Sequence, residues 1–127
     1  MMVNHIALYV QDLESEKFFF ERYFQGESGE RYHNSKTGFT SYFISFEDGA
    51  RLEIMNDSLT MGHKNGRRQM GYAHIAFGVG SKDAVEKLTE QLRADGFRII
   101  SEPRTTGDGY YESCIADKEG NHIEITI

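Results

Sequence analysis

Hydrophobic and polar positions along this chain alternate with two different periods, and the same succession of periods occurs twice. Val3–Val10 and Tyr72–Val79 are short runs rich in β-branched and aromatic residues, which predicts two strands. Each run has a histidine at its third position, and aligning His5 with His74 gives an offset of 74 − 5 = 69 residues. The chain is therefore predicted to contain an internal duplication.

A helix is predicted after each of these two strands. In the first half Asp12 is a suitable N-cap, and apolar residues follow at helical spacing as far as Gly26. In the second half Ser81 is the suitable cap, and the helix is predicted to stop at Gly96. The apolar stripe of this second helix consists of Ala84, Val85, Leu88 and Leu92.

Three strand-like runs follow each predicted helix. In the first half they are Glu27–Asn34, Phe39–Phe46 and Arg51–Met55. In the second half they are Phe97–Glu102, Tyr110–Ala116 and His122–Ile127. Asp48-Gly49 and the turn residues around Gly120 join the last two strands of each half into hairpins. Each half is therefore predicted to be a β-α-β-β-β module in an α+β fold.

The domain organisation follows from this repeat. We predict one domain over residues 1–127, made of a module at 1–56 and a module at 71–127 that are joined by a loop at 57–70. A length of 127 residues suits one compact domain, since domains most often have about 100–150 residues. Hydrophobic residues make up 39% of the chain, which is enough for a packed core.

Charge and cysteine content limit the binding partners and the cellular compartment that are expected for this chain. The net charge of −6 disfavours nucleic acid and anionic membrane surfaces, because phosphate groups repel an acidic surface. No apolar run approaches the roughly 20 residues of a membrane helix, and the first residues do not resemble a signal peptide. Cys114 is the one cysteine and is expected to be a packed, inert thiol. A cytoplasmic location is the simplest expectation.

Two glutamates occupy equivalent places in the last strand of each half. Glu53 stands between Leu52 and Ile54, and Glu124 is likewise flanked by two isoleucines. Since side chains alternate between the faces of a strand, each glutamate should point away from its apolar neighbours. The same holds for His5 beside Ile6 and for its counterpart in the second half.

These four polar side chains predict a metal site. The spacing between histidine and glutamate is similar in both halves, 53 − 5 = 48 and 124 − 74 = 50. A single histidine or glutamate on a strand is usually an ordinary solvated residue, but the repeat makes all four positions match in type and place. Imidazole nitrogen and carboxylate oxygen suit Zn, Ni, Co, Mn or Fe(II), and the lack of thiolates argues against a structural zinc site.

The chain resembles the vicinal oxygen chelate superfamily, which includes glyoxalase I, extradiol dioxygenases, fosfomycin-resistance enzymes and bleomycin-resistance proteins. The segments NHIALYVQDLE, ARLEIM, GYAHIAFGV and DKEGNHIEI carry the resemblance and span nearly the full length. It implies that the modules form a cupped, partly closed mixed sheet around a divalent metal ion. The positions that match the ligands of glyoxalase I are His5, Glu53, His74 and Glu124. The other enzymes of the family typically use two histidines and one glutamate, and bleomycin-binding members lack the metal set.

The resemblance implies a glyoxalase I-like lyase or isomerase. In such an enzyme the hemithioacetal of methylglyoxal and glutathione becomes S-lactoylglutathione through a metal-stabilised enediolate. A metal-associated glutamate moves the proton between adjacent carbons, and Glu124 is the first candidate for this base, with Glu53 as the second. The resemblance also implies a homodimer, in which the ligands of one site can come from one chain or from two.

The match departs from glyoxalase I at the position where an arginine usually binds the glutathione carboxylate, because Tyr9 stands there. Candidate substrate-binding residues are Arg104, Tyr111 and Arg67. The segment Arg104–Tyr111 is interpreted either as a loop that closes over the site or as an ordinary glycine-rich turn. Two further classes stay open: another metalloenzyme of the family, acting by thiol transfer to an epoxide or by ring cleavage, and a non-catalytic drug-binding protein.

Overall fold

The computed structural model describes residues 4–61, 72–107 and 109–127. The chain divides into two compact units, Met1–Gly62 and His63–Ile127. Within these described ranges each unit contains one helix and one mixed sheet, and the order of elements confirms the predicted α+β class with two modules. Most of the loop predicted at 57–70 lies outside the described residues.

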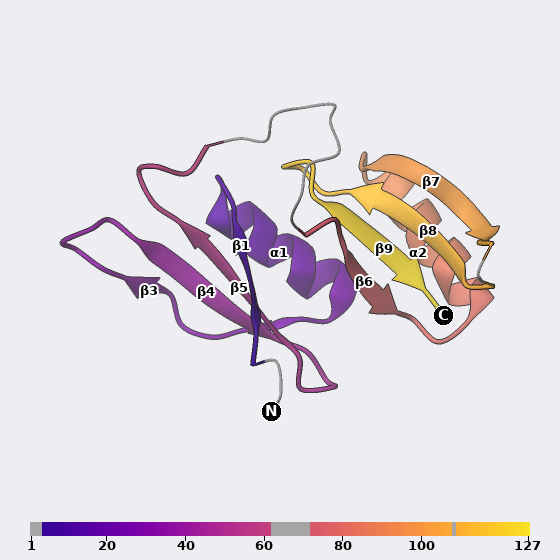
Figure 1. Ribbon diagram of the computed structural model, residues 1–127, viewed down its shortest axis with the longest axis horizontal. Coiled ribbons are helices and arrows are strands. Elements are labelled where there is room, and N and C mark those ends of the chain that lie inside the picture. Colours follow the sequence, from indigo (N-terminus) through magenta and orange to yellow (C-terminus); the bar gives the residue numbers. More distant parts are fainter. Residues whose placement is uncertain (1–3, 62–71, 108) are drawn as a thin grey trace. The chain divides into compact units, whose positions relative to one another are not determined.

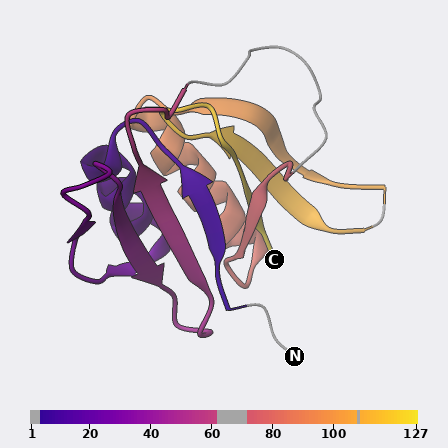
Figure 2. The same ribbon diagram turned by 60° about the vertical axis from the view of Figure 1, so that its left-hand side comes forward.

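The first unit contains a five-stranded sheet and the helix α1. Its elements are β1 (Ile6–Tyr9), α1 (Leu13–Phe24), β2 (Glu27–Ser28), β3 (Tyr32–His33), β4 (Thr40–Ser45) and β5 (Arg51–Asn56). Strand β5 lies between β1, which runs parallel to it, and β4, which runs antiparallel, as Figure 2 shows. Figure 1 shows α1 lying along one face of this sheet. The other face carries the side chains that point away from the helix.

The strand predicted over Glu27–Asn34 is wrong as one element, because the structure divides it into β2 and β3. Ser28 pairs with Ile44 and Tyr32 pairs with Ser41, so three residues on one side face two residues of β4. One residue is therefore extra, as in a β-bulge. Gly29 lies in this interruption, and its backbone N–H donates to the carbonyl of Phe43 over 2.9 Å. Alternation of side chains alone does not reveal such an inserted residue.

The second unit contains a four-stranded sheet and the helix α2. Its elements are β6 (Ile75–Gly78), α2 (Lys82–Ala94), β7 (Arg98–Thr105), β8 (Tyr111–Ala116) and β9 (His122–Thr126). The strand order is β6-β9-β8-β7, with β6 parallel to β9 and the other pairs antiparallel. This order repeats the β1-β5-β4 arrangement of the first unit, which confirms the duplication.

Strand β7 runs further than predicted. The prediction ended at Glu102, yet Arg104 pairs with Glu112 and Thr105 pairs with Tyr111. Pro103 lacks a backbone N–H, and it is tolerated here because β7 is an edge strand whose register shifts between Ser101 and Arg104. The loop predicted over Arg104–Tyr111 is therefore wrong at its first end, since Arg104 and Thr105 belong to β7, whereas its last end runs into β8 as predicted.

Both helices begin at the predicted caps. The Asp12 carboxylate accepts from the backbone N–H of Ser15 over 2.9 Å, and the Ser81 hydroxyl accepts from that of Ala84 over 3.2 Å. The first helix ends at Gln25, which adopts the left-handed conformation with φ of 56°. A Cβ atom on the following Gly26 would meet Ile44 Cγ2 at 2.5 Å. Gly26 is therefore required by close packing and not by the helix cap itself.

Each unit buries its own apolar layer between helix and sheet. In the first unit this layer includes Phe19, Phe20, Phe24, Ile44, Leu52 and Ile54. In the second unit it includes Val85, Leu92, Ile115, Ile123 and Ile125. Such side chains supply most of the free energy of folding, at about 1.5–3 kcal/mol for each fully buried one. The apolar layer fixes which residues of each strand point toward the opposite face.

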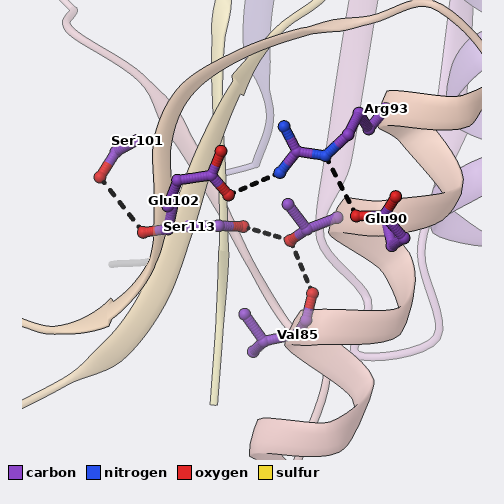
Figure 3. A network of polar contacts seen from close by, with 7 residues as sticks. Val85, Glu90, Arg93, Ser101, Glu102 and Ser113 are labelled. Atoms are coloured by element: carbon purple, nitrogen blue, oxygen red, sulfur yellow. Dashed lines mark hydrogen bonds and ion pairs between the residues drawn. The ribbon is translucent and has the colours of Figure 1, made fainter.

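A buried polar contact lies within the apolar layer of the second unit. Thr89 Oγ1 donates to the carbonyl of Val85 over 2.6 Å and therefore accepts from Ser113 Oγ, also at 2.6 Å. Figure 3 shows this network beside Arg93, which bonds to Glu90 of the same helix and to Glu102 of β7. Both groups of contacts connect α2 to its sheet. No helix in the described part of the chain is long and apolar enough to cross a membrane.

Candidate functional site

The first histidine–glutamate pair lies on the face of the sheet that points away from α1. In the parallel ladder of β1 and β5, Ala7 is opposite Glu53, and His5 precedes Ala7 by two residues. The neighbours Leu52 and Ile54 are buried against the helix, at 3% and 0% exposure. Glu53 therefore points to the other face, where its Oε2 lies 3.7 Å from His5 Nε2.

The second unit repeats this arrangement at the same register. Ala76 of β6 is opposite Glu124 of β9, and His74 precedes Ala76 by two residues. Both isoleucines that flank Glu124 are fully buried, so its carboxylate also points away from the helix. Its Oε2 lies 3.1 Å from His74 Nε2. Each unit therefore brings one imidazole and one carboxylate together on the face opposite its helix.

The donor chemistry and the distances in each pair fit two ligands of one metal ion. Two atoms bound to a metal at about 2.1 Å lie about 3.0 Å apart at a right angle and about 3.4 Å apart at a tetrahedral angle. The observed separations of 3.1 and 3.7 Å need only small side-chain rotations to reach these values. No group of three or more histidine, cysteine, aspartate or glutamate side chains that could hold a metal is found among the described residues. Each unit alone supplies a pair.

Three further residues surround the first pair, and the sequence analysis missed them. The Asn4 side-chain oxygen lies 2.9 Å from His5 Nδ1 and accepts from an Arg51 guanidinium N–H, also at 2.9 Å. The Phe43 ring meets the His5 ring edge-on with centroids 5.1 Å apart, and the Arg51 guanidinium lies 4.6 Å from the Phe43 centroid. These contacts depend on the register of the two strands, which local sequence does not reveal. Pairing of Ile6 with Leu52 brings position 51 beside position 5.

Cys114 lies beside the second pair, since it is opposite Glu124 in the ladder of β8 and β9. Burial raises the pKa of its thiol to about 11, and the negative charges of Glu124 and Glu112 add to this effect. The thiol therefore stays protonated near neutral pH, where a nucleophile would need to be a thiolate. This supports the expectation that Cys114 is inert.

The structure brings Arg104 to the same face of the second sheet as Glu124. Arg104 is opposite Glu112, and alternation along β8 then puts Glu112 and Cys114 on one face. The Arg104 Nε–H donates to Ser101 Oγ over 3.1 Å, and this contact holds the guanidinium along the strand. A cation is therefore available on the face that carries the carboxylate.

The structure does not bring Tyr111 to that face. Tyr111 is two residues from Ser113, which points to the helix, and its hydroxyl donates to Glu86 of α2 over 2.7 Å. This hydrogen bond raises the pKa of Tyr111 above its ordinary value. The Lys82 ammonium also lies 4.9 Å from the ring centroid. Arg67, the third candidate for substrate binding, lies outside the described residues.

Tyr9 is opposite Met55, and both share the face of Glu53. The Tyr9 side chain is 55% exposed, so its ring is accessible on that face. At the position where resemblance to glyoxalase I predicts a cationic arginine, this chain therefore has a neutral aromatic side chain.

Comparison with known proteins supports the fold of the two modules. A curated relative, the uncharacterized protein YqjT of Bacillus subtilis, is 29% identical over 128 aligned residues, covering 97% of this chain and 96% of that protein. The crystal structure of SMU.1112c matches 100% of this chain and 98% of its own, with 25% identity and a TM-score of 0.81. The trypanothione-dependent glyoxalase I of Leishmania major shares the fold at 19% identity and a TM-score of 0.79, with 99% of this chain and 86% of that chain covered.

A family model covers almost the whole chain. The model of the Glyoxalase/Bleomycin resistance protein/Dioxygenase superfamily matches residues 2–125, a span that includes both histidine–glutamate pairs. This match agrees with the resemblance found in the sequence and with the paired modules of the structure. The chain belongs to the glyoxalase/bleomycin resistance protein/dioxygenase superfamily.

Proposed function

We propose that this protein is a metal-dependent lyase or isomerase of the glyoxalase I type, and that His5, Glu53, His74 and Glu124 together hold one divalent metal ion. The observation that carries the proposal is the repeated pair: each unit has an imidazole and a carboxylate at the same register on the face opposite its helix. Because both pairs are present, the chain matches the four-ligand set of glyoxalase I better than the set of two histidines and one glutamate in the other enzymes of the superfamily.

The donor set suits Zn, Ni or Co, and it also accepts Mn or Fe(II). Such an ion, when bound, supplies Lewis-acid stabilisation of negative charge on the oxygens of a small carbonyl substrate. The flanking apolar residues Leu52 and Ile54, and their counterparts around Glu124, hold the strands that present the carboxylates.

Glu124 acts as base and then as acid in the proposed reaction. It takes the proton from the carbon that bears sulfur and oxygen in the hemithioacetal, and it returns a proton to the adjacent carbonyl carbon. The hydroxyl proton of the first carbon passes to the oxygen of the second carbon. The product is then a 2-hydroxy thioester, an isomer of the hemithioacetal, so no outside oxidant or reductant is needed. General acid–base catalysis of this kind contributes about 10²–10⁴-fold in rate. Glu53 occupies the equivalent register and is the second candidate for this role.

We propose that the thiol part of the substrate is not bound in the way that glyoxalase I binds glutathione. Tyr9 offers no positive charge to a carboxylate on the face of Glu53. Arg104 lies on the face of Glu124, and it is the proposed contact for an anionic group.

An assay of methylglyoxal with several thiols tests the proposed reaction. We expect thioester to form with at least one thiol, to cease when a chelator removes the metal, and to return when Zn, Ni or Co is added back. Metal-dependent turnover of an epoxide with a thiol, or oxygen uptake that needs Fe(II), would instead assign another reaction of the superfamily. A protein that takes up no metal and binds a cationic drug would exclude both kinds of enzyme.

We also propose that the protein acts on its substrate as a homodimer in the cytoplasm. Among the described residues, β1 and β6 each pair with a strand of their own sheet on one side only, and an unpaired strand edge favours pairing with a second chain. Light scattering during size-exclusion chromatography measures the mass directly, and a mass of one chain would contradict the dimer.

A further inference from the structure

We propose that Asn4, oriented by Arg51, is a positioning residue that fixes which nitrogen of His5 carries its proton. We further propose that His5 and His74 are opposite tautomers in the metal-free protein, with the proton on Nδ1 in His5 and on Nε2 in His74. The consequence for metal binding rests on the proposed function, whereas the tautomers themselves do not.

The Asn4 amide has only one orientation that suits its neighbours. Two nitrogens, His5 Nδ1 and an Arg51 guanidinium nitrogen, lie 2.9 Å from the same side-chain atom. A guanidinium can only donate, so the atom that faces it must be the amide oxygen. An amide oxygen can only accept, and His5 Nδ1 must therefore carry a hydrogen to make its bond.

A proton on Nδ1 leaves Nε2 of a neutral His5 with its lone pair. The other polar neighbour of this ring, Glu53 Oε2, lies 3.7 Å from Nε2, which is beyond the usual range of a hydrogen bond. The bond at Nδ1 therefore decides the tautomer. Histidines that bind metals through one nitrogen usually donate from the other nitrogen to an oxygen, and Asn4 supplies that oxygen here.

Arg51 is itself held in place. Its guanidinium lies 4.6 Å from the centroid of the Phe43 ring, in cation–π geometry. The same ring contacts His5 edge-on at 5.1 Å. Asn4 and Phe43 therefore each contact the imidazole, and Arg51 contacts both of them, which limits rotation of the His5 ring as well as its tautomer.

The second unit lacks this arrangement. Ala73 precedes His74 where Asn4 precedes His5, and the pairing of Ile75 with Ile123 puts His122 at the register position of Arg51. His74 Nε2 lies only 3.1 Å from the Glu124 carboxylate, which favours a proton between these two atoms. No acceptor for His74 Nδ1 is found in the described part of this unit. His74 must therefore lose its Nε2 proton when it binds metal, whereas His5 is already in the binding form.

Long-range proton–nitrogen NMR spectra of the ¹⁵N-labelled, metal-free protein test this directly. The spectra are recorded at about pH 8.5, which is about two units above the pKa of an ordinary imidazole side chain, and assigned with a His5→Gln variant. We expect the Nδ1–H pattern for His5 and the Nε2–H pattern for His74. In Asn4→Ala, His5 should shift toward the Nε2–H form while His74 stays unchanged as the internal reference. Asn4→Asp keeps the oxygen and should restore the wild-type pattern.

Arginine variants test the orienting role of Arg51. Arg51→Met should weaken the tautomer preference of His5, since the amide can then rotate. Arg98→Met removes an exposed arginine from β7 in the other unit and should leave both histidines unchanged. A His5 that carries its proton on Nε2 in the wild type, or that does not respond to Asn4→Ala, overturns the proposal.

Titration with Zn or Ni separates this inference from the proposed function. If the site binds metal, Asn4→Ala should weaken the affinity by about 10-fold or more, as loss of a partner of a ligating histidine commonly does, and Asn4→Asp should not. A wild type with the expected tautomers that binds no metal removes the proposed function and leaves the positioning role intact. Tight binding that is equal in wild type and Asn4→Ala contradicts the positioning role alone.

Discussion

Apolar neighbours decide which way the candidate ligands point. Glu124 has a fully buried isoleucine on each side, so turning its carboxylate inward would bury a charge and expose two apolar side chains. Glu53 is held in the same manner by Leu52 and Ile54. The direction of each carboxylate therefore follows from three consecutive residues, and no distant contact is needed to explain it.

Glu124→Gln and Glu53→Gln should each lower kcat by at least about 100-fold, since an amide cannot accept the proton and is a weaker metal ligand. Metal content, measured on the same preparations, should fall in both variants. If the site uses three ligands, Glu53→Gln should retain both metal and most of the activity.

Glu112→Gln is the matched control for these two variants. Glu112 shares the face of Glu124 but is not a proposed ligand, so metal content should not change. A loss of metal in this control as large as in Glu124→Gln would contradict the assigned ligands.

Cys114 should react slowly with alkylating reagents in the folded, metal-free protein. Because burial raises its pKa to about 11, the thiolate is scarce at every pH below that value. At about pH 8 the folded protein should react on the order of 100-fold more slowly than the unfolded chain, and the rate should still be rising with pH at about pH 9. Timed alkylation followed by mass spectrometry measures both rates. A rate that levels off below pH 8 would contradict the raised pKa.

At the level of elements, helix and sheet fit together through small or matched side chains at a few positions. In the first unit Gly26 lets the end of α1 approach β4, because a Cβ there would overlap Ile44. In the second unit the hydroxyls of Thr89 and Ser113 form a hydrogen bond with each other between α2 and β8. Both contacts fix the helix on its sheet and so fix the face that remains for the candidate ligands.

Gly26→Ala should destabilise the protein by about 1–3 kcal/mol, the usual cost of forcing an extra carbon into a packed core. Chemical denaturation monitored by circular dichroism measures the change. Gly29→Ala is the control, because its added Cβ would lie 3.7 Å from the nearest atom, an ordinary contact. Equal stability of the two variants would show that Ile44 gives way easily.

Thr89→Val should cost about 1–3 kcal/mol, because Ser113 then lacks its buried partner. The double variant Thr89→Val, Ser113→Ala removes both hydroxyls and should recover part of that loss. Urea denaturation of the two single variants and the double variant gives the coupling energy. Costs that simply add would contradict the hydrogen bond between the two side chains.

For the whole molecule, duplication supplies two equivalent pairs of donors. The described residues of each unit bring together one imidazole and one carboxylate, which is fewer ligands than most protein metal sites use. The four residues form one site only if both pairs contribute to the same ion, within one chain or across a dimer. The number of ions bound therefore distinguishes one shared site from two separate pairs.

We expect one metal ion for each set of four ligands, and His5→Ala and His74→Ala should each abolish tight binding of Zn or Ni. Isothermal titration measures both affinity and stoichiometry. Removal of the metal with a chelator should also lower the Tm of the wild type, because an ion that binds only the folded state stabilises it. Two ions per chain, with each variant losing only one of them, would show two independent pairs.

The sequence by itself determined the duplication, the helix caps and the faces of the candidate ligands. These features depend on neighbours within a few residues: Asp12 and Ser81 cap the turn that follows them, and Glu124 is directed by the two residues beside it. The resemblance to the superfamily agreed with the same pattern, and the match over residues 2–125 confirmed it.

Tertiary structure alone decided the features that depend on register between distant strands. Asn4 meets Arg51 only because β1 and β5 pair in one alignment out of several possible ones. Arg104 pairs with Glu112 past a proline for the same reason, whereas Tyr111 meets Glu86 because α2 packs against that face of the sheet. Local periodicity sets the face of a side chain, but hydrogen bonds across a sheet set which side chains meet, and no short stretch of sequence contains that information.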